Sequence, residues 1–261
     1  MALIGANGGL IGTQRSANIN TAPGLWTANE QVLLRRAATW PLRYDPNFSS
    51  VSLLLHMDGT NGSTTFTDTS SNALTVTPSG NAQISTAQSK FGGASALFDG
   101  TGDFLTTAST SGVAFGTGQF TIELWLRLNS LSASYRALVA TRPNEGSFSD
   151  GFGLGCTSSG EIYMYDSAFR ATSPSGTVTT NTWYHIALVR DTGSALRIYS
   201  NGNLVATSTA TNNYTRTVMT IGANASSSEP LNGYIDDLRI TKGIARYTAN
   251  FTPPTAAFFD A

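Results

Sequence analysis

The sequence holds a single cysteine, Cys156, in a chain of 261 residues. One thiol cannot form an intrachain disulfide, so oxidative crosslinks are excluded as a source of stability. A chain of this length can bury enough apolar surface to fold without them. Cys156 follows Gly153-Leu154-Gly155, and two interpretations stay open: a small buried apolar side chain, which is the commoner role, or a reactive thiol.

Charged residues are also scarce. They make up 12% of the chain, and the formal net charge is -1. This balance provides no cationic surface for phosphates, so the composition argues against nucleic-acid binding. Hydrophobic residues make up 40% and aromatic residues 10% of the chain, which favours a packed protein over a disordered one.

Long apolar runs are absent from the sequence. No segment approaches the roughly 18 consecutive apolar residues that a membrane-spanning helix needs, so we expect no membrane partner. The first ten residues, MALIGANGGL, have neither the basic region nor the long apolar core of a secretory signal. The sequence therefore predicts a protein that is made and folded in a cytoplasm.

Catalytic pairs are missing as well. The sequence holds five glutamates and two histidines, His56 and His185. Some glycoside hydrolases carry paired carboxylates close together on one strand. No two glutamates of this sequence are spaced in that way. Glu123 stands alone in its segment, where Arg127 is the one partner on offer. The sequence therefore predicts a protein that is not an enzyme, with structural roles for both histidines.

From Val51 onward the sequence has the two-residue period of β-strands. Residues 120–128 show the clearest alternation, and clusters of Gly, Asn and Ser separate the strands as in an all-β sandwich. Asn201-Gly202 predicts a tight hairpin, since both central residues of a type I′ turn need positive φ. We predict strands at 51–57, 74–76, 94–98, 103–107, 120–128, 137–141, 152–156, 161–165, 183–190, 196–199, 203–205 and 231–240.

A different pattern occupies the first 48 residues. Residues 1–25 show no periodicity and predict an extended arm. Thr27-Ala28-Asn29-Glu30 has the pattern of a capping box and starts a short helix, which ends before Trp40-Pro41. A helix this short is marginal in water unless it docks on a surface. We therefore predict an anchor at 1–48 and a β-sandwich domain at 49–261.

The anchor needs apolar and cationic residues at its contact with an assembly. The alternative is that the same residues cover one end of their own sandwich. The predicted contact residues are Trp26, Leu33, Leu34, Arg35, Arg36 and Trp40.

Exposed aromatic side chains near amide or carboxylate groups would indicate sugar binding, because aromatic rings stack on the faces of sugars. Aromatic side chains also fill protein cores, so both interpretations stay open for each residue. The candidates in predicted loops, or near them, are Tyr135, Phe148, Tyr163, Tyr165 and Tyr214.

Several segments resemble a laminin-G-like, concanavalin-A-like jelly-roll module of the kind that recurs in structural proteins of tailed bacteriophages. The resemblance covers residues of about 51–256. Residues 24–41 resemble a short element that precedes such modules in phage virion proteins. The segments that carry the main resemblance are LLLHMDG, FDGTGDFL, FTIELW, WYHIA and GYIDDLRI.

The resemblance implies an all-β fold, a two-sheet antiparallel jelly-roll sandwich preceded by the extended arm and one short helix. It also implies a non-enzymatic virion protein of a tailed phage, in a fibre, a decoration or the tail, anchored by its arm in a symmetric assembly. Its partners would be other virion proteins, copies of itself in a homo-oligomer and glycans of the host surface. The alternative is a carbohydrate-binding adhesin module of a bacterial surface protein.

Aspartates of the first loop and of the last long strand indicate a calcium site. Asp236 and Asp237 lie among apolar residues, where a carboxylate needs a partner, and on a strand they point to opposite faces. The resemblance implies that calcium, which prefers such oxygen ligands, joins the first loop to this strand. We predict the ligands Asp58, Asp68 and Asp237. The alternative is that Asp68 caps a turn and Asp237 accepts backbone or arginine hydrogen bonds.

Overall fold

The computed structural model describes residues 44–141, 150–224 and 228–261. Residues Asn47–Asp260 form one compact unit. The predicted arm, its helix and the predicted anchor residues, from Trp26 to Trp40, lie outside the described part of the chain. None of the helices within the described ranges is long and apolar enough to cross a membrane.

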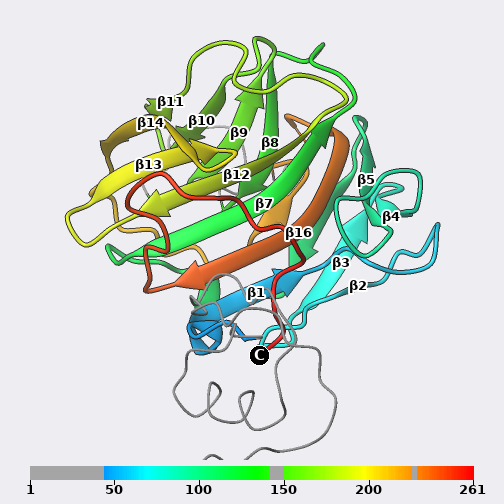
Figure 1. The fold of residues 1–261 in the computed structure, drawn as a ribbon, viewed down its shortest axis with the longest axis horizontal. Coiled ribbons are helices and arrows are strands. Elements are labelled where there is room, and N and C mark those ends of the chain that lie inside the picture. Colours follow the sequence, from blue (N-terminus) through cyan, green and yellow to red (C-terminus); the bar gives the residue numbers. More distant parts are fainter. Residues whose placement is uncertain (1–43, 142–149, 225–227) are drawn as a thin grey trace, which may run out of the picture. The chain divides into compact units, whose positions relative to one another are not determined.

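Two antiparallel sheets make up this unit (Figure 1). The strands of the first sheet are β1 (Val51–Leu55), β4 (Gln83–Ser85), β5 (Ser95–Asp99), β7 (Phe120–Leu128), β12 (Trp183–Arg190), β13 (Ala195–Ser200), β14 (Asn203–Thr209) and β16 (Asn232–Lys242). Among the described residues their order is β14-β13-β12-β7-β16-β5-β4, with β1 also paired to β16. The long strands β7 and β16 therefore lie at the centre of this sheet.

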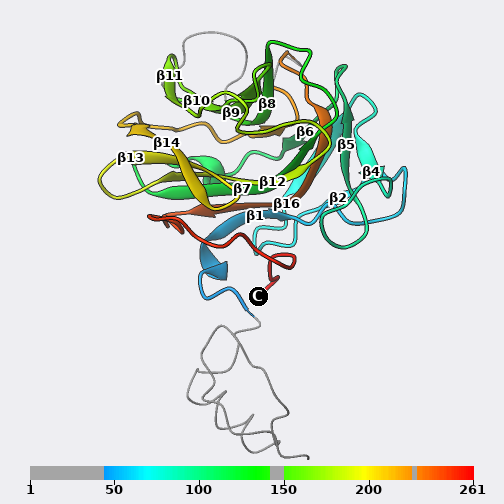
Figure 2. The ribbon, with the colours of Figure 1, turned by 45° about the horizontal axis from the view of Figure 1, so that its top comes forward.

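The second sheet packs against one face of the first (Figure 2). Its strands are β2 (Phe66–Thr67), β3 (Thr75–Ser79), β6 (Phe104–Thr107), β8 (Tyr135–Ala140), β9 (Gly153–Thr157), β10 (Ile162–Tyr165), β11 (Phe169–Thr172) and β15 (Thr220–Ile221). Their order in the described residues is β11-β10-β9-β8-β15-β6-β3-β2. Two short 3-10 helices, Phe48–Ser50 and Ser111–Val113, lie outside the sheets.

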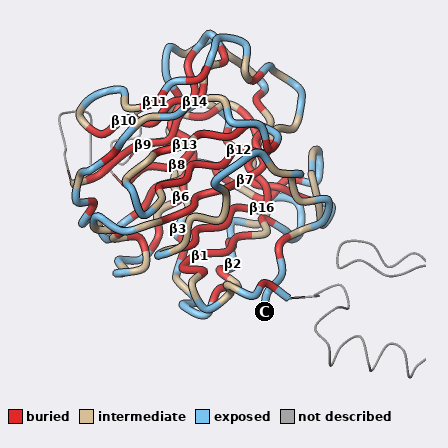
Figure 3. Tube along the Cα trace, turned by 60° about the vertical axis from the view of Figure 1, so that its left-hand side comes forward, coloured by how far each residue is buried: buried red, intermediate tan, exposed pale blue. Residues whose placement is uncertain are grey.

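The hydrophobic core lies between the two sheets. Ile122 and Leu124 of β7 point inward and belong to one cluster with Leu154 of β9 and Ile162 of β10. Alternate residues of a strand point to opposite faces, which is why the two-residue period of the sequence marks these strands. Figure 3 shows buried residues running through the strands of both sheets. The predicted all-β sandwich of two antiparallel sheets is confirmed.

The predicted hairpin at Asn201-Gly202 joins β13 to β14. Both residues have positive φ, 48° and 76°, and Ser200 pairs with Asn203 across the turn. Glycine is needed at position 202 for a second reason, because a Cβ there would lie 1.9 Å from the carbonyl oxygen of Phe251. This close approach brings the C-terminal segment against the hairpin.

The C-terminal segment, residues 243–260, covers the outer face of the first sheet. In Figure 1 it is drawn in red and orange and crosses in front of β12, β7 and β16. Tyr247 and Phe251 pack with Val189 and Tyr199 in a second hydrophobic cluster, on the side away from the second sheet. The outward-facing residues Thr121, Glu123 and Trp125 of β7 are therefore buried as well as the inward-facing ones, and Arg127 is half-buried.

The remaining differences concern short or irregular strands. The predicted strand at 51–57 ends at Leu55, and Met57 has a positive φ of 59°. Four strands have no counterpart in the sequence analysis, namely β2, β4, β11 and β15. They have two, three, four and two residues, too few for a period to be visible.

Candidate functional site

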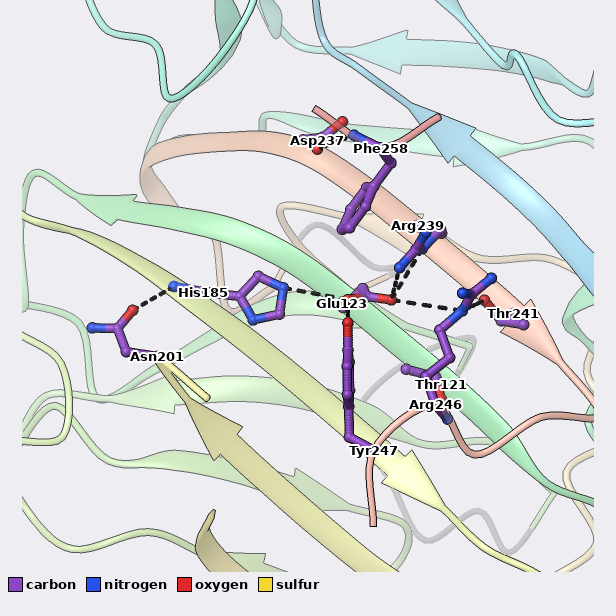
Figure 4. A network of polar contacts seen from close by, with 10 residues as sticks. All are labelled: Thr121, Glu123, His185, Asn201, Asp237, Arg239, Thr241, Arg246, Tyr247 and Phe258. Carbon is purple, nitrogen blue, oxygen red and sulfur yellow. Dashed lines mark hydrogen bonds and ion pairs between the residues drawn. The ribbon is translucent and has the colours of Figure 1, made fainter. Parts of the chain in front are cut away.

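Glu123 of β7 is fully buried on the outer face of the first sheet, at the centre of a polar network (Figure 4). Its Oε1 atom accepts hydrogen bonds from Arg239 of β16, at 3.0 Å from Nε and 2.8 Å from Nη2. Its Oε2 atom accepts a hydrogen bond of 2.7 Å from the Tyr247 hydroxyl and lies 3.3 Å from Nε2 of His185. Both carboxylate oxygens are therefore engaged by groups of the same chain.

The charge of Glu123 is stabilised by its neighbours. Burial acts to raise the pKa of Glu123, but the Arg239 guanidinium and the nearby His185 imidazole outweigh it and bring the pKa to about 2. Arg127, the partner that the sequence offered, instead donates to Asn129 at 3.0 Å. That expectation is wrong because β16 and the C-terminal segment supply cations that lie closer to the carboxylate.

Asp68, a predicted calcium ligand, directly follows β2 and is buried. Its Oδ1 atom accepts hydrogen bonds of 2.9 Å from the backbone amides of Leu54 and Ser70. Its Oδ2 atom accepts from the Leu74 amide at 2.8 Å and from the Ser70 hydroxyl at 2.9 Å. These contacts give Asp68 the turn-capping role that the sequence left open as the alternative.

Asp237, the second predicted ligand, lies in a β-bulge of β16 with a φ of 47°. Its Oδ1 atom lies 2.7 Å from Nδ1 of His56, and its Oδ2 atom accepts a hydrogen bond of 2.9 Å from the Phe258 amide. The hydrogen bond with Asp237 raises the pKa of His56 to about 9, against the opposing effect of burial. Asp237 thus fixes the C-terminal segment through a backbone amide.

Asp58, the third predicted ligand, is exposed. The buried Asp236 accepts hydrogen bonds from the amides of Lys90 and Phe91 at 2.6 and 3.1 Å, and burial raises the pKa of Asp236 to about 7. Among the described residues, no group of three or more His, Cys, Asp or Glu side chains is arranged to hold a metal ion. The calcium site stays a prediction.

Four aromatic side chains form a cluster on the second sheet: Tyr135 of β8, Tyr163 and Tyr165 of β10, and Phe169 of β11. The Tyr163 ring lies edge-on to Tyr135 and Phe169, with centroid distances of 5.7 and 5.2 Å. The rings of Tyr135 and Phe169 are 5.8 Å apart and inclined by 29°, and Tyr165 lies 5.3 Å from Phe169. Tyr163 is 2% exposed, whereas Tyr135 is 42% and Phe169 49% exposed. We call these four residues the aromatic platform.

The alternation of β10 places the platform on the outer face of the second sheet. Ile162 and Met164 point into the core, so Tyr163 and Tyr165 point away from it. Gly155 of β9 pairs with Tyr163, and a Cβ at Gly155 would lie 2.4 Å from the Tyr163 hydroxyl oxygen. Glycine at this position therefore lets the Tyr163 ring lie across β9.

Tyr135, Tyr163 and Tyr165 are three of the aromatic candidates that the sequence identified, and the structure brings them together. Phe148 lies outside the described residues. Tyr214 is 1% exposed and packs in the core, so the core interpretation holds for it. Sequence reasoning missed Phe169, although the series of aromatic residues along β10 and β11 was an available signal.

Residues 99–245 match the family model of the concanavalin A-like lectin/glucanases superfamily. The chain belongs to this superfamily. The matched region contains both Glu123 and the aromatic platform, and the predicted laminin-G-like, concanavalin-A-like fold is confirmed. No curated protein matches the chain at a significant level.

Solved structures share the superfamily fold at low sequence identity. Domain 4 of AbnA, an extracellular GH43 arabinanase from Geobacillus stearothermophilus in complex with arabinotriose, matches with a TM-score of 0.56 and 18% identity, over 75% of this chain and 94% of that one. The botulinum neurotoxin serotype C1 binding domain matches with 0.56 and 18%, over 76% of this chain. The Paraclostridial Mosquitocidal Protein 1 binding domain matches with 0.56 and 13%, over 77%. The chain spans half the length of each toxin domain.

Proposed function

We propose that the chain is a non-catalytic saccharide-binding module and that the aromatic platform is its binding surface. The observation that carries the proposal is the exposure of Tyr135 and Phe169, at 42% and 49%, above an almost fully buried Tyr163. Single exposed apolar residues are ordinary, but grouped aromatic rings on a rigid sheet are typical of a binding surface.

A saccharide suits this surface because sugar rings have apolar C–H faces and polar edges. The faces stack on aromatic rings, and the hydroxyl groups can bond to the phenol groups of Tyr135 and Tyr165. The arabinanase domain has a similar fold, and its structure was solved in complex with a saccharide, arabinotriose. This likeness supports the proposal, and the platform residues are its basis in this chain.

The charges near the platform favour a neutral saccharide. Within residues 135–141 and 150–172, four of the five charged side chains bond to another side chain. Asp150 pairs with Arg216, Glu161 accepts from Thr157, and Asp166 pairs with Arg170. The fifth, Arg136, is 1% exposed. A ligand held by stacking and neutral hydrogen bonds binds with little dependence on salt, since salt screens interactions between charges.

The polar network of the first sheet supports the non-catalytic part of the proposal. Glu123 lies beneath the C-terminal segment, and its oxygens are engaged by Arg239 and Tyr247. A glycosidase needs two carboxyl groups that flank a sugar bond. Glu123 is fully buried, so it cannot contact a glycosidic bond.

A glycan array, followed by titration calorimetry with the best neutral ligand, tests the proposal. Tyr135→Ala and Phe169→Ala are each expected to weaken binding by about fivefold, because a lost stacking contact is worth on the order of 1 kcal/mol. Phe259→Ala is the matched control, since Phe259 is 43% exposed and lies outside the platform. Wild-type affinity in both platform variants, or release of sugar from the ligand, would contradict the proposal.

We also propose, from the resemblance of residues 24–41 and 51–256, that the module works in a tailed-phage virion and is anchored through residues 1–48. A chain that begins near Ser49 is expected to fold and bind saccharide but to fail to join the particle. Mass spectrometry of purified particles tests whether the full chain is present. Its absence there, with saccharide binding intact, would favour the adhesin module.

A further inference from the structure

The turn between β10 and β11 presents two residues of the aromatic platform. Tyr165 ends β10 and Phe169 begins β11, so residues 166–168 set the direction of both. The turn is tight: the Asp166 amide donates to the carbonyl of Ala168 at 3.1 Å, and Ser167 has a φ of 88°. A non-glycine residue in this conformation is strained, so surrounding contacts must hold the turn in place.

The Asp166 side chain supplies such contacts from a fully buried position, with 1% exposure. Its Oδ1 atom accepts a hydrogen bond from Nε of Arg170, on β11. Its Oδ2 atom accepts from the Asn212 side-chain amide at 2.8 Å and from the Tyr214 hydroxyl at 2.5 Å. Hydrogen bonds to a carboxylate are among the stronger ones in proteins.

Tyr214 is itself fixed in the core. Its ring centroid lies 5.1 Å from Phe152 and 6.3 Å from Phe120, and the Arg190 guanidinium lies over the ring at 4.7 Å. Its backbone exchanges hydrogen bonds of 2.8 and 3.0 Å with Gly116. The Tyr214 hydroxyl is therefore a donor held by the sandwich interior.

The Arg190 side chain completes the support. It donates to the carbonyl oxygens of Gly118, Asn212 and Gly116, at 2.8, 2.9 and 2.6 Å. The chain that carries Asn212 and Tyr214 is thus tied to strand β12, which holds Arg190. This continuous set of contacts runs from the core, through Tyr214 and Asp166, to the turn below Phe169.

We infer that Asp166 and Tyr214 are positioning residues, which hold Phe169 and Tyr165 in the orientation that a saccharide requires. The inference rests on the proposed function. A platform ordered before binding loses less conformational freedom when the ligand arrives, so its affinity is higher. Neither residue contacts the ligand, and both act through Phe169.

Tyr214→Phe tests the inference, because it removes the hydroxyl and keeps the ring in the core. Calorimetry with the neutral saccharide selected on the array, at a temperature where every variant is folded, is expected to show binding about three- to tenfold weaker. In a Phe169→Ala background the same change is expected to alter the affinity less than about twofold, because the ring that it positions is gone. Tyr199→Phe is the matched control: Tyr199 is fully buried on the first sheet, and its hydroxyl donates to the Tyr247 carbonyl.

A second variant keeps the test decisive if Tyr214→Phe does not fold. Asn212→Ala removes another donor to Asp166 from a half-buried position, and the same loss and the same coupling to Phe169 are expected. Wild-type affinity in folded Tyr214→Phe or Asn212→Ala, or equal losses with and without Phe169, overturns the positioning role. Wild-type affinity in Phe169→Ala alone also overturns the positioning role, whereas wild-type affinity in both Phe169→Ala and Tyr135→Ala overturns the proposed function.

Discussion

The Tyr247 hydroxyl donates a hydrogen bond of 2.7 Å to Oε2 of Glu123, across 124 residues of the chain. The two residues come from the C-terminal segment and from the centre of the first sheet. The bond fastens this segment over an outer sheet face that would otherwise expose a carboxylate among apolar side chains. The C-terminal segment therefore contributes to the stability of the domain.

Tyr247→Phe is expected to lower the free energy of unfolding by about 1–3 kcal/mol, because it leaves one oxygen of a buried carboxylate without its donor. Urea unfolding measures this change. Tyr184→Phe is a suitable control, since the Tyr184 hydroxyl bonds to Thr179 at 2.9 Å on the exposed surface. Equal stabilities of the two variants would show that the bond to Glu123 contributes nothing beyond the packing of the ring.

Glu123 also makes stability depend on pH. The pKa of Glu123 is about 2 in the folded protein against 4.5 for the ordinary group. Because the folded-state pKa is the lower one, the stabilisation is fully present above pH 4.5 and is lost as the pH falls toward 2. The loss is on the order of 3 kcal/mol for a shift of this size. Urea unfolding over this pH range should show a smaller loss in Glu123→Gln than in the wild type, and parallel curves would contradict the pKa.

Most of the fold follows from local patterns in the sequence. The period of residues 120–128 and the Asn201-Gly202 pair predict a strand and a hairpin that the structure contains, since both depend on neighbouring residues alone. The partners of Glu123 could not be predicted in this way. Arg239 and Tyr247 are separated from it by 116 and 124 residues, and their approach depends on how the sheet and the C-terminal segment pack.

The aromatic platform was predicted only in part, because its assembly also depends on long-range packing. Tyr135, Tyr163 and Tyr165 stand out as aromatic residues in or near predicted loops, but composition cannot separate them from Tyr214, which lies in the core. Their difference arises from the face to which each strand position points. Phe169 joins the platform through a strand of four residues, which is too short for its period to be recognised.

The predicted calcium site can be tested on the wild-type protein. An ion that binds the folded state alone raises stability by about 2.7 kcal/mol at a hundredfold excess over its dissociation constant. A chelator should therefore lower the melting temperature, and Asp58→Asn should remove that response. Asp58 is the most informative position, since Asp68 and Asp237 already accept hydrogen bonds that their substitution would break. A melting temperature that a chelator leaves unchanged would show that no bound calcium ion stabilises the fold.

Gly155→Ala tests whether the platform depends on the space that this glycine leaves for the Tyr163 ring. The new Cβ would lie 2.4 Å from the Tyr163 hydroxyl oxygen and 2.5 Å from the Arg136 carbonyl oxygen. The second contact is with backbone, which cannot move without disturbing the pairing of β8 and β9. The first contact displaces the Tyr163 ring from its place beneath Tyr135, and the second strains the pairing of the two strands. The expected cost is about 1–3 kcal/mol in unfolding free energy, typical of overpacking.

The same substitution should weaken saccharide binding more than its loss of stability explains, because it displaces the ring on which Tyr135 and Phe169 rest. Calorimetry well below the melting temperature separates the two effects. Gly193→Ala is the matched control, since a Cβ there would meet its nearest neighbour, Oδ1 of Asp191, at an ordinary 3.5 Å. A folded Gly155→Ala protein with wild-type affinity would mean that the saccharide does not require the Tyr163 ring beneath the two exposed side chains.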